Sequence, residues 1–497
     1  MPTNTVLLLV NLVYLAITLA IGFVAYRRTT RSADDYFLGG RTTRTFVLFM
    51  ALFGTNVTPF LLLGIPGLSY HSGIGEFGRN AAIIALGIPL TFYLIGYPAY
   101  IAARAIGAIT PAELYRERFG SPAVGLVLFL AYFAYTLPYM VTSVLGVGIA
   151  VSVLTGGAMS LATGAALILV ITIVYTTLGG MRATMWTNVF QGTVFLAFIV
   201  LLFVIVARDM GGLASATAAV QAHDASLLMP GDRPQFQPGA FASWGLAISL
   251  TVIGFPHIFV RLFTARDEAA IKNVCRLYPI ILLALWLPAV LLGVWGAVEF
   301  PELVGRASDR VFPLLVQRHV GPVLQGVALA GVMAAVMSTL DAQILTLSSM
   351  LSRDVLRRYA VRVLDGAAGE RREVLIGRLF MVALAVVVFV IVLMRPASIF
   401  DIAKFSFSGY VTLVPTLYLG LRWRRFTAAG AIASILGGNV ALLLAIAGWL
   451  PSFGLLPVAH GLVAAIVLGV VVSLWTEPAP TECAERVLGP IERVFGP

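Results

Sequence analysis

The chain has 497 residues, of which 59% are hydrophobic and only 11% are charged, and its mean hydropathy is +0.95. This composition excludes a water-soluble globular domain and predicts a protein that crosses the membrane many times. The net charge of +10 comes from basic residues divided among short loops, which excludes a basic domain of the kind that binds nucleic acid.

Apolar segments of about twenty residues, long enough to cross a hydrocarbon core of about 30 Å, recur along the whole chain. Strands of a membrane barrel would instead alternate in hydrophobicity over about ten residues. We therefore predict an all-α polytopic membrane protein with about thirteen transmembrane helices. The predicted spans are 5–26, 46–70, 81–103, 122–151, 160–178, 188–207, 242–263, 278–298, 321–348, 379–394, 400–421, 427–449 and 458–475.

Arginine and lysine predict the orientation, because short cytoplasmic loops carry more of them than external loops do. They concentrate in the loops after odd-numbered spans, most densely between Arg353 and Arg378. We expect a multi-pass protein of the cell (inner) membrane, with its N-terminus outside and its C-terminus in the cytoplasm. The first span lacks a basic leader and a cleavage site, so we expect it to be retained. Cys275 and Cys483 both fall on the predicted cytoplasmic side, where a disulfide is not expected.

The span 46–70 is poorly suited to an unbroken helix. Pro59 and Pro66 each remove a backbone donor, and Gly54 and Gly64 lower the helix propensity. A break at mid-membrane frees carbonyl groups, which lipid tolerates only where they line a cavity or bind a ligand. The alternative is a simple proline kink in a packed helix.

The span 242–263 contains a second interruption signal, because Gly254 and Pro256 lie two positions apart. A pair of interrupted spans indicates a binding site near the middle of the membrane. The neighbouring residues Ile248 and Val252 are apolar.

The span 321–348 contains the chemically most distinctive stretch, residues 334–343. Ala335, Ser338 and Thr339 stand at positions i, i+3 and i+4 and therefore share one helix face, and Asp341 follows three residues after Ser338. Hydroxyls, a helix carbonyl and a carboxylate are hard oxygen ligands for an alkali cation. A charge at membrane depth is costly and usually functional. The alternative is that Ser338 and Thr339 only bond back to their own helix.

These features, together with further motifs in the same order, resemble the sodium:solute symporter family. The likeness runs from about residue 5 to about residue 475, and it is nearest to the pantothenate, proline and monocarboxylate branches. The motifs lie at 34–41, 51–67, 110–120, 175–192, 254–261 and 333–343. One position departs from the family pattern, since Asn188 stands where many members have Asp. This replacement puts in doubt any second cation site that the Asp would have helped to build.

The resemblance implies a leucine-transporter-like inverted five-plus-five helix repeat within one transporter domain, residues 1–497. The expected division is a first helix and cytoplasmic turn at 1–45, a first repeat at 46–207, a second repeat at 242–421, two last helices at 427–475 and a short cytoplasmic tail at 476–497.

The resemblance also implies a sodium site and an adjoining substrate site. The expected sodium ligands are the carbonyls of Gly54, Val57 and Ala335 and the hydroxyls of Ser338 and Thr339. The substrate is expected near Asn56, Thr58, Tyr139, Thr142 and Phe255. Asp341 lies outside the general pattern, and we hypothesise that its carboxylate compensates for Asn188 by adding negative charge near the cation.

We therefore expect sodium-coupled symport of a small organic solute by alternating access. The solute is expected to be carboxylate or amino-acid-like, such as pantothenate, a monocarboxylate or an amino acid, because helix N-termini at the breaks favour a carboxylate. Proline is less favoured, since Ile248 and Val252 stand where the proline branch has aromatic residues. A sugar is less favoured because few amides and aromatic rings are expected in the pocket.

Two alternatives remain open: a proton-coupled carrier that uses Asp341, and a transporter-like sensor module, against which the short tail argues. An enzyme is not expected, because the spans offer few His, Asp, Glu or Cys residues that could converge. Sodium is the expected coupling ion, and the expected partners are the solute and the lipid bilayer. We expect a monomer or a weak homo-oligomer.

Overall fold

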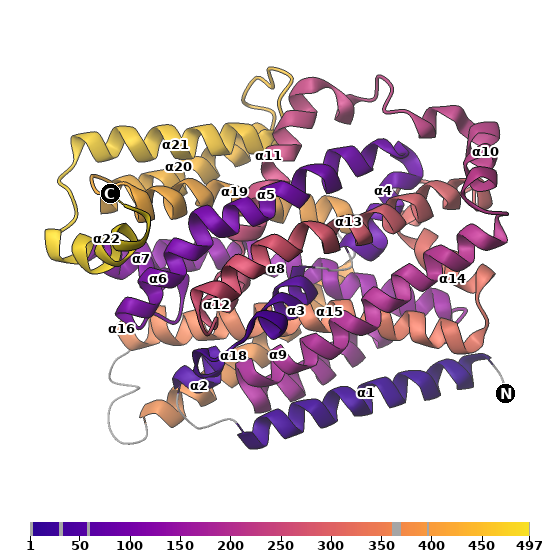
Figure 1. Ribbon diagram of the computed structural model, residues 1–497, viewed down its shortest axis with the longest axis horizontal. Helices are drawn as coiled ribbons and strands as arrows, with labels where there is room; N and C mark the ends of the chain where they lie inside the picture. Colours follow the sequence, from indigo (N-terminus) through magenta and orange to yellow (C-terminus); the bar gives the residue numbers. More distant parts are fainter. Residues whose placement is uncertain (1–2, 29–32, 57–59, 360–368, 395–396, 497) are drawn as a thin grey trace.

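The computed structural model describes residues 3–28, 33–56, 60–359, 369–394 and 397–496. Its long helices run roughly along one axis and form a single bundle (Figure 1). Within these ranges there is no strand, and extended pairing is limited to one isolated bridge between Thr43 and Ala265. The predicted all-α class is confirmed.

Short 3₁₀- or π-helical segments, labelled η, interrupt or flank several of the helices. The elements of the first part of the chain are α1 (Thr3–Arg28), α2 (Ala33–Leu38), η1 (Gly39–Arg41), α3 (Thr45–Asn56), η2 (Phe60–Gly64), α4 (Ile65–Ser72), η3 (Phe77–Ala82), α5 (Ile83–Thr91), η4 (Phe92–Gly96), α6 (Tyr97–Ile106), α7 (Pro111–Phe119), α8 (Pro122–Leu154) and α9 (Leu161–Asp209).

The remaining elements begin after the long helix α9. They are α10 (Leu213–Asp224), η5 (Ala225–Leu228), η6 (Pro234–Phe236), α11 (Pro238–Gly254), α12 (Pro256–Phe263), α13 (Glu268–Glu299), η7 (Gly305–Arg310), α14 (Val311–His319), α15 (Pro322–Met350), η8 (Leu351–Leu356), α16 (Arg357–Tyr359), α18 (Gly369–Met394), α19 (Ile399–Arg422), α20 (Ala428–Ile446), α21 (Pro457–Trp475) and α22 (Thr481–Phe495).

Nine helices of the described chain are long and apolar enough to cross a membrane, or up to 11 spans if each bent pair counts as one. A multi-pass protein is therefore confirmed, but the expected number of about thirteen spans is not. Two predicted spans, 160–178 and 188–207, lie within α9, where the chain is interrupted at Gly180 with φ 56° and ψ −150°. Only glycine adopts that backbone conformation readily.

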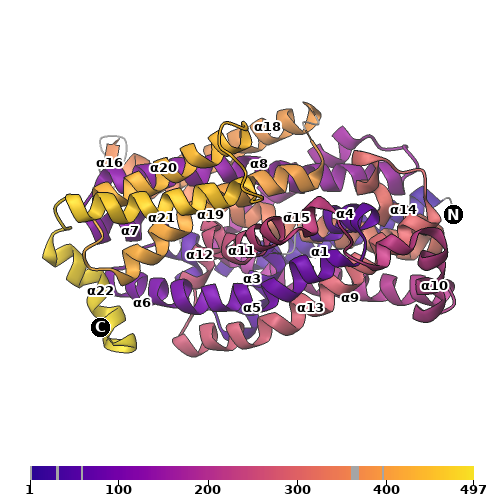
Figure 2. The same ribbon diagram turned by 90° about the horizontal axis from the view of Figure 1, so that it is seen from above.

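The two termini lie at opposite ends of the long axis in both side views (Figures 1 and 2). The end that carries the N-terminus also carries α10 and α14, and we call it the N-terminal end. The other end carries α22, α6 and α7, and we call it the C-terminal end. This placement is the one expected when an odd number of spans separates the termini.

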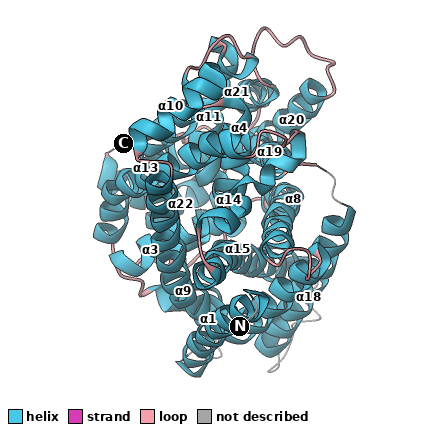
Figure 3. Ribbon diagram, turned by 90° about the vertical axis from the view of Figure 1, so that its right-hand side faces the viewer, coloured by secondary structure: helices cyan, strands magenta, loops and turns pink. Residues whose placement is uncertain are grey.

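Helix α15 forms the centre of the bundle. Viewed from the N-terminal end it lies inside, whereas α1, α18 and α21 lie at the edge (Figure 3). Every residue from Ala328 to Met350 is buried, which is the pattern of a helix enclosed on all sides. The hydroxyl and carboxylate groups of α15 therefore face protein and not lipid.

Both predicted interruptions are present. Helix α3 and the following η2–α4 segment are bent by 52° relative to each other, and α11 and α12 are bent by 50°. Phe255 connects α11 to α12 in an extended conformation, and Pro256 occupies the first turn of α12, where a backbone N–H is not needed. Residues 57–59, with the predicted breaker Pro59, lie outside the described residues.

At the N-terminal end, His319 joins the ends of three helices. Its Nδ1 lies 3.0 Å from Oδ2 of Asp209 on α9, and its Nε2 lies 2.8 Å from Oε1 of Glu299 on α13. Arg318 also pairs with Glu299, at 3.1 Å. The hydrogen bond with Glu299 raises the pKa of His319 above its ordinary value of 6.5, assisted by Asp209 and opposed by partial burial.

Because the pKa of His319 is higher in the folded protein than in the unfolded chain, its contribution to stability is complete below pH 6.5 and is lost as the pH rises through the raised pKa. His319→Gln should therefore lower the unfolding free energy by about 1–2 kcal/mol at pH 6 and by much less at pH 9. Thermal unfolding of the detergent-solubilised protein at both pH values measures this difference. His223→Gln, at an exposed position on α10, is the control. An equal loss of unfolding free energy for His319→Gln at both pH values would contradict a raised pKa of His319 in the folded protein.

Candidate functional site

Helix α15 and the first interrupted helix meet at a group of buried oxygen atoms. The Ser338 hydroxyl oxygen lies 2.8 Å from the carbonyl oxygen of Gly54 and 3.1 Å from that of Ala335. The Thr339 hydroxyl oxygen lies 3.1 Å from the carbonyl oxygens of both Thr55 and Ala335. We call these three carbonyl oxygens and two hydroxyl oxygens the oxygen cluster.

The oxygen cluster contains four of the five residues that the sequence predicts as sodium ligands. The fifth, Val57, lies outside the described residues. The prediction missed Thr55, for which the only sequence signal was its place beside Gly54 before the break. Helix α3 ends at Asn56, and the last four carbonyls of a helix have no partner within it. The carbonyls of Gly54 and Thr55 are therefore available to other ligands.

The chemistry of the oxygen cluster suits an alkali cation. All five atoms are neutral, hard oxygens, and both hydroxyls can rotate their protons away from an incoming cation. The described residues contain no group of three or more His, Cys, Asp or Glu side chains that could hold a metal ion. Soft or borderline metals prefer thiolate and imidazole ligands, so these residues fit sodium better than zinc or copper.

Asn188 on α9 supports the oxygen cluster from a third helix. Its Nδ2 lies 3.3 Å from the Thr55 hydroxyl and 3.3 Å from the carbonyl oxygen of Ser338. The Thr55 hydroxyl donates to the same carbonyl at 3.3 Å. Within the described part of the chain the Asn188 Oδ1 has no hydrogen-bond partner, although it is buried. A neutral amide, and not a carboxylate, therefore stands against the cluster.

Asp341 lies about one helix turn beyond Ser338, toward the C-terminal end, and is part of a buried ion pair. One carboxylate oxygen lies 3.4 Å from an Arg261 guanidinium nitrogen, and the other accepts a hydrogen bond from the Tyr175 hydroxyl at 3.0 Å. Arg261 also donates to the carbonyl of Ala51 on α3 at 2.7 Å. Arg261 therefore balances the negative charge of Asp341.

A small space lies beside the two breaks. Its volume of about 30 Å³ has room for about one or two water molecules and not for an organic solute. Its lining is Asn56, Phe60, Leu61, Ile84, Ile88, Tyr139, Ile248, Thr251, Val252, Phe255, Leu282, Trp286 and Phe407. We call it the inner site.

Three of the residues predicted near the substrate, Asn56, Tyr139 and Phe255, line the inner site together. Thr142 does not line it; this residue is buried, and its hydroxyl donates to the Tyr139 carbonyl at 2.7 Å. Thr58 lies outside the described residues.

The expectation of a pocket with few aromatic rings is wrong. Tyr139 stacks on Phe255 with ring centroids 5.1 Å apart, and Phe407 meets Tyr139 edge-on at 5.2 Å. Phe60 contacts Phe407 at 5.1 Å, and Trp286 completes the aromatic lining. Phe60 follows the first break directly, so its position could have been predicted. Trp286 and Phe407 come from distant spans, and only the packing of α13 and α19 brings them here.

An all-helical membrane bundle with two interrupted helices beside a central site is the architecture of secondary transporters. The sodium:solute symporter family matches residues 36–438, and the chain belongs to this family. It is therefore a sodium-coupled transporter and not an enzyme, and sodium is its coupling ion.

Relatives of similar length align with nearly the whole chain. The osmoregulated proline transporter OpuE of Bacillus subtilis (strain 168) is 26% identical over 97% of this chain and 97% of its own length. The sodium/proline symporter of Salmonella typhimurium (strain LT2) is 26% identical over 92% of this chain and 91% of its own length.

Solved structures share the fold. A Na+-coupled sialic acid symporter in a substrate-bound, outward-open state has a TM-score of 0.79 at 19% identity, covering 96% of this chain and 99% of that one. Mhp1, a nucleobase-cation-symport-1 family transporter, has a TM-score of 0.60 at 16% identity, covering 93% of this chain and 99% of that one. These likenesses confirm the leucine-transporter-like fold class.

Proposed function

We propose that the protein couples sodium movement to the uptake of a small amino acid, with proline as the first candidate, by alternating access. The observation that carries this proposal is the oxygen cluster between α3 and α15, directly beside the inner site. The two proline transporters among the relatives favour proline over pantothenate. This choice departs from the expectation based on Ile248 and Val252, although both residues line the inner site.

The coupling between cation and solute follows from one helix end. Thr55 contributes its carbonyl oxygen to the oxygen cluster, and the next residue, Asn56, lines the inner site. A sodium ion held by Thr55 and by the Ser338 and Thr339 hydroxyls fixes the end of α3 against α15. The same ion thereby sets the position of Asn56, so sodium and solute must strengthen each other's binding by the same factor.

The lining of the inner site suits a small zwitterion with an apolar ring. The faces of Phe60, Tyr139 and Phe255 provide apolar surface and attract a cationic amine. The amide of Asn56 supplies polar contacts. Helix α12 begins at Pro256 beside the site, and the positive end of its dipole favours the carboxylate.

We propose the same membrane arrangement and repeat limits as the sequence predicts. The first repeat spans 46–207 and the second spans 242–421, so each begins with one of the bent pairs. The N-terminal end faces outward and the C-terminal end faces the cytoplasm. The positions of the termini at opposite ends of the bundle support an odd number of crossings.

Neither alternative function is supported by a specific observation. A proton carrier based on Asp341 would need that group to exchange protons during transport, but Asp341 is held by Arg261 and Tyr175 inside the protein. A sensor module is not favoured either, because relatives named as transporters align over almost the full length of the chain.

Uptake into proteoliposomes tests the proposal. The purified protein is given an inward sodium gradient, or a matched potassium gradient, with labelled proline, pantothenate, lactate or glucose outside. We expect proline to accumulate only with sodium, and pantothenate to accumulate much less. Equal proline uptake in sodium and in potassium would contradict sodium coupling, and accumulation of pantothenate without proline would contradict the solute assignment.

A further inference from the structure

Helix α22 lies across the C-terminal end of the bundle, against α6, α7 and α19 (Figure 1). With 15 residues it is shorter than a transmembrane span of about 20 residues. Its buried residues Ala484, Val487, Leu488 and Ile491 stand at positions i, i+3, i+4 and i+7 and form one apolar stripe. Its other face carries exposed charged residues. Helix α22 is therefore an amphipathic helix whose apolar stripe packs on the protein.

Ion pairs attach α22 to α7 and to the turn after α19. Arg424 in that turn pairs with Glu485 at 3.1 Å and also with Glu492. Arg486 lies 3.6 Å from Glu117 on α7. These pairs hold α22 to the part of the bundle that contains α7 and α19.

An aromatic contact attaches the last turn of α22 to α6. The ring centroid of Phe495 lies 5.0 Å from that of Tyr97 on α6 and 5.9 Å from that of Tyr93 on η4. The Arg422 guanidinium lies over the other side of this contact, 4.5 Å from the Phe495 ring centroid. One short helix thus connects α6 with α7 and α19.

Helices α6 and α7 are bonded to different parts of the transport machinery. Arg104 on α6 donates to the carbonyl of Arg266, just after α12, at 2.7 Å. The Thr110 hydroxyl, at the start of α7, donates to the Asp354 carboxylate beyond the end of α15 at 2.8 Å. Gly107, between α6 and α7, has φ 75°, which glycine adopts without strain. Helix α22 therefore spans a joint between a part linked to α12 and a part linked to α15.

The inner site lies between the same two parts. Ile84 and Ile88 line it from α5, which continues through η4 into α6, and Phe407 lines it from α19. Arg118 on α7 donates to the carbonyl of Gly420 on α19 at 2.9 Å, so α7 and α19 belong together. Opening of the inner site toward the C-terminal end requires α6 and α12 to move away from α7, α15 and α19. That movement has to break or stretch the contacts of α22.

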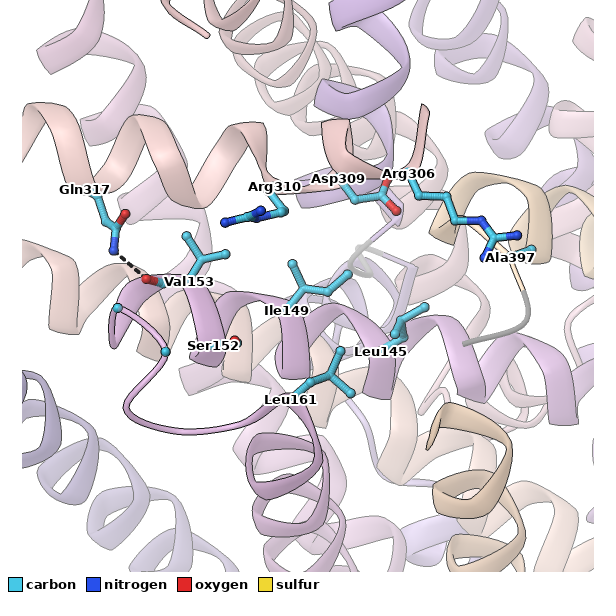
Figure 4. Close-up of a pocket in the computed structure, with 12 residues that line it drawn as sticks. Leu145, Ile149, Ser152, Val153, Leu161, Arg306, Asp309, Arg310, Gln317 and Ala397 are labelled. Atoms are coloured by element: carbon cyan, nitrogen blue, oxygen red, sulfur yellow. Dashed lines mark hydrogen bonds between the residues drawn. The ribbon is translucent and has the colours of Figure 1, made fainter. Parts of the chain in front are cut away.

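The opposite end of the bundle is hollowed. A cavity of about 730 Å³ lies there between α8, η7 and α14 (Figure 4). The apolar residues Leu145 and Ile149 of α8 face Arg306 and Arg310 across it. Helix α22 therefore lies across the end of the molecule that is farther from this cavity.

We propose that α22 is a latch that opposes opening of the inner site toward the C-terminal end, and that salt weakens this latch. The inference goes beyond the proposed function and takes from it only that the inner site opens to both ends in turn. The side chains of Arg424 and Glu485 are 51% and 59% exposed. A groove of about 600 Å³ along α22, lined by Glu485, Arg486 and Glu492, lets water and ions reach the pairs.

The exposure of these pairs makes the latch sensitive to ionic strength. The screening length falls from about 30 Å at 0.01 M salt to about 3 Å at 1 M, and exposed ion pairs are individually weak. The apolar stripe of α22 is not screened. Salt should therefore loosen α22 and favour opening without unfolding the bundle.

Thiol labelling in potassium chloride measures this opening without sodium and therefore without transport. The Ala51 carbonyl accepts a hydrogen bond from Arg261, which pairs with Asp341, so Ala51 lies where α3, α12 and α15 meet. Ala51 is fully buried, and Ala51→Cys in a Cys275→Ser/Cys483→Ser background reports opening. An uncharged maleimide is the reagent, and each rate is divided by that of the unfolded protein at the same salt concentration.

The labelling rate should rise about fivefold between about 0.01 M and about 1 M potassium chloride. Arg424→Gln should give a similar rise at low salt and leave little further dependence on salt. Phe495→Ala, which frees α6, should also raise the rate at low salt. Glu482→Gln removes an exposed acidic residue of α22 that makes none of these contacts, and it should behave like the wild type.

A charge reversal separates the ion pairs from a general effect of the substitutions. Arg424→Glu with Glu485→Arg and Glu492→Arg restores opposite charges at the same positions and should restore the low rate. Leu345→Cys, one turn after Asp341 on α15 and also buried, replaces the reporter if Ala51→Cys does not fold.

The native Cys483 reports whether α22 itself is released. Its sulfur lies against the end of α7, because a Cβ added to Gly120 would come within 3.1 Å of it. Salt should accelerate modification of both Cys483, in a Cys275→Ser background, and Ala51→Cys. Acceleration at Cys483 alone means that α22 detaches without controlling the inner site, and it overturns the proposal. A rate at Ala51→Cys that is unchanged by salt and by Arg424→Gln overturns it as well. Absence of sodium-dependent uptake of any amino acid overturns the proposed function, whereas salt-dependent labelling at Ala51→Cys still supports the latch.

Discussion

Replacing Ser338 and Thr339 together by alanine should raise the sodium concentration for half-maximal uptake about a hundredfold or more, because each hydroxyl oxygen near a charge contributes about 1.5–3 kcal/mol, or about 3–6 kcal/mol for the two together. These two hydroxyls are the only side-chain oxygens of the oxygen cluster, and the backbone carbonyls remain after the substitution. Uptake measured over a range of external sodium concentrations gives the shift.

The same helix provides a matched control. Thr346→Ala with Ser349→Ala removes the same atoms from α15, but within the described residues Ser349 donates to the Thr346 carbonyl at 2.7 Å and the Thr346 hydroxyl has no hydrogen-bond partner. This control should keep the sodium dependence of the wild type. If the Ser338→Ala/Thr339→Ala variant also keeps it, the cation does not bind at the oxygen cluster.

Breaking the ion pair between Arg261 and Asp341 should have the second large effect. Asp341→Ala leaves a fully buried guanidinium without its counter-charge, which costs about 3–5 kcal/mol of unfolding free energy. Removing both charges, with Asp341→Asn and Arg261→Gln, should recover much of that loss because no unpaired charge stays buried. Thermal unfolding of the three proteins measures the difference. If the double variant is less stable than Asp341→Ala, the loss of stability does not come from an unpaired buried charge.

The ion pair also has an expected effect on transport. Arg261 on α12 is bonded to α3 through Ala51 and to α15 through Asp341, so it holds together the parts of both interrupted helices that lie toward the C-terminal end. Asp341→Asn should loosen this contact and lower the final accumulation of solute. We expect it to leave sodium half-saturation unchanged, because Arg261 already balances the carboxylate. A rise of about tenfold would instead support Asp341 as the charge that compensates for Asn188.

Much of the fold could be predicted because bilayer thickness imposes long apolar segments and because Gly and Pro weaken helices locally. The breaks at Gly254 and Pro256 and the shared face of Ser338 and Thr339 follow from such short-range rules. The number of helices does not translate directly into a number of spans, because α9 joins two helices across a kink at Gly180 and is counted once.

The parts of the site that depend on packing between distant segments could not be predicted. The sequence offers no sign that Arg261 and Asp341, 80 positions apart, form a pair. The same holds for Trp286 and Phe407, which reach the inner site only after α13 and α19 pack against the breaks. Arg306 and Arg310 lie in a long segment that we predict to be external, where basic residues carry little information about topology. Only the folded chain places them opposite the apolar face of α8.

Reciprocal binding to the purified protein is the measurement that we would make first. Proline affinity is determined at several sodium concentrations, and sodium affinity at several proline concentrations, for the wild type and for the Ser338→Ala/Thr339→Ala variant. Each ligand should tighten the other by the same factor, about 5- to 150-fold, and both factors should fall to about one in the variant. Proline affinity that is the same in potassium and in sodium would contradict coupling through the oxygen cluster.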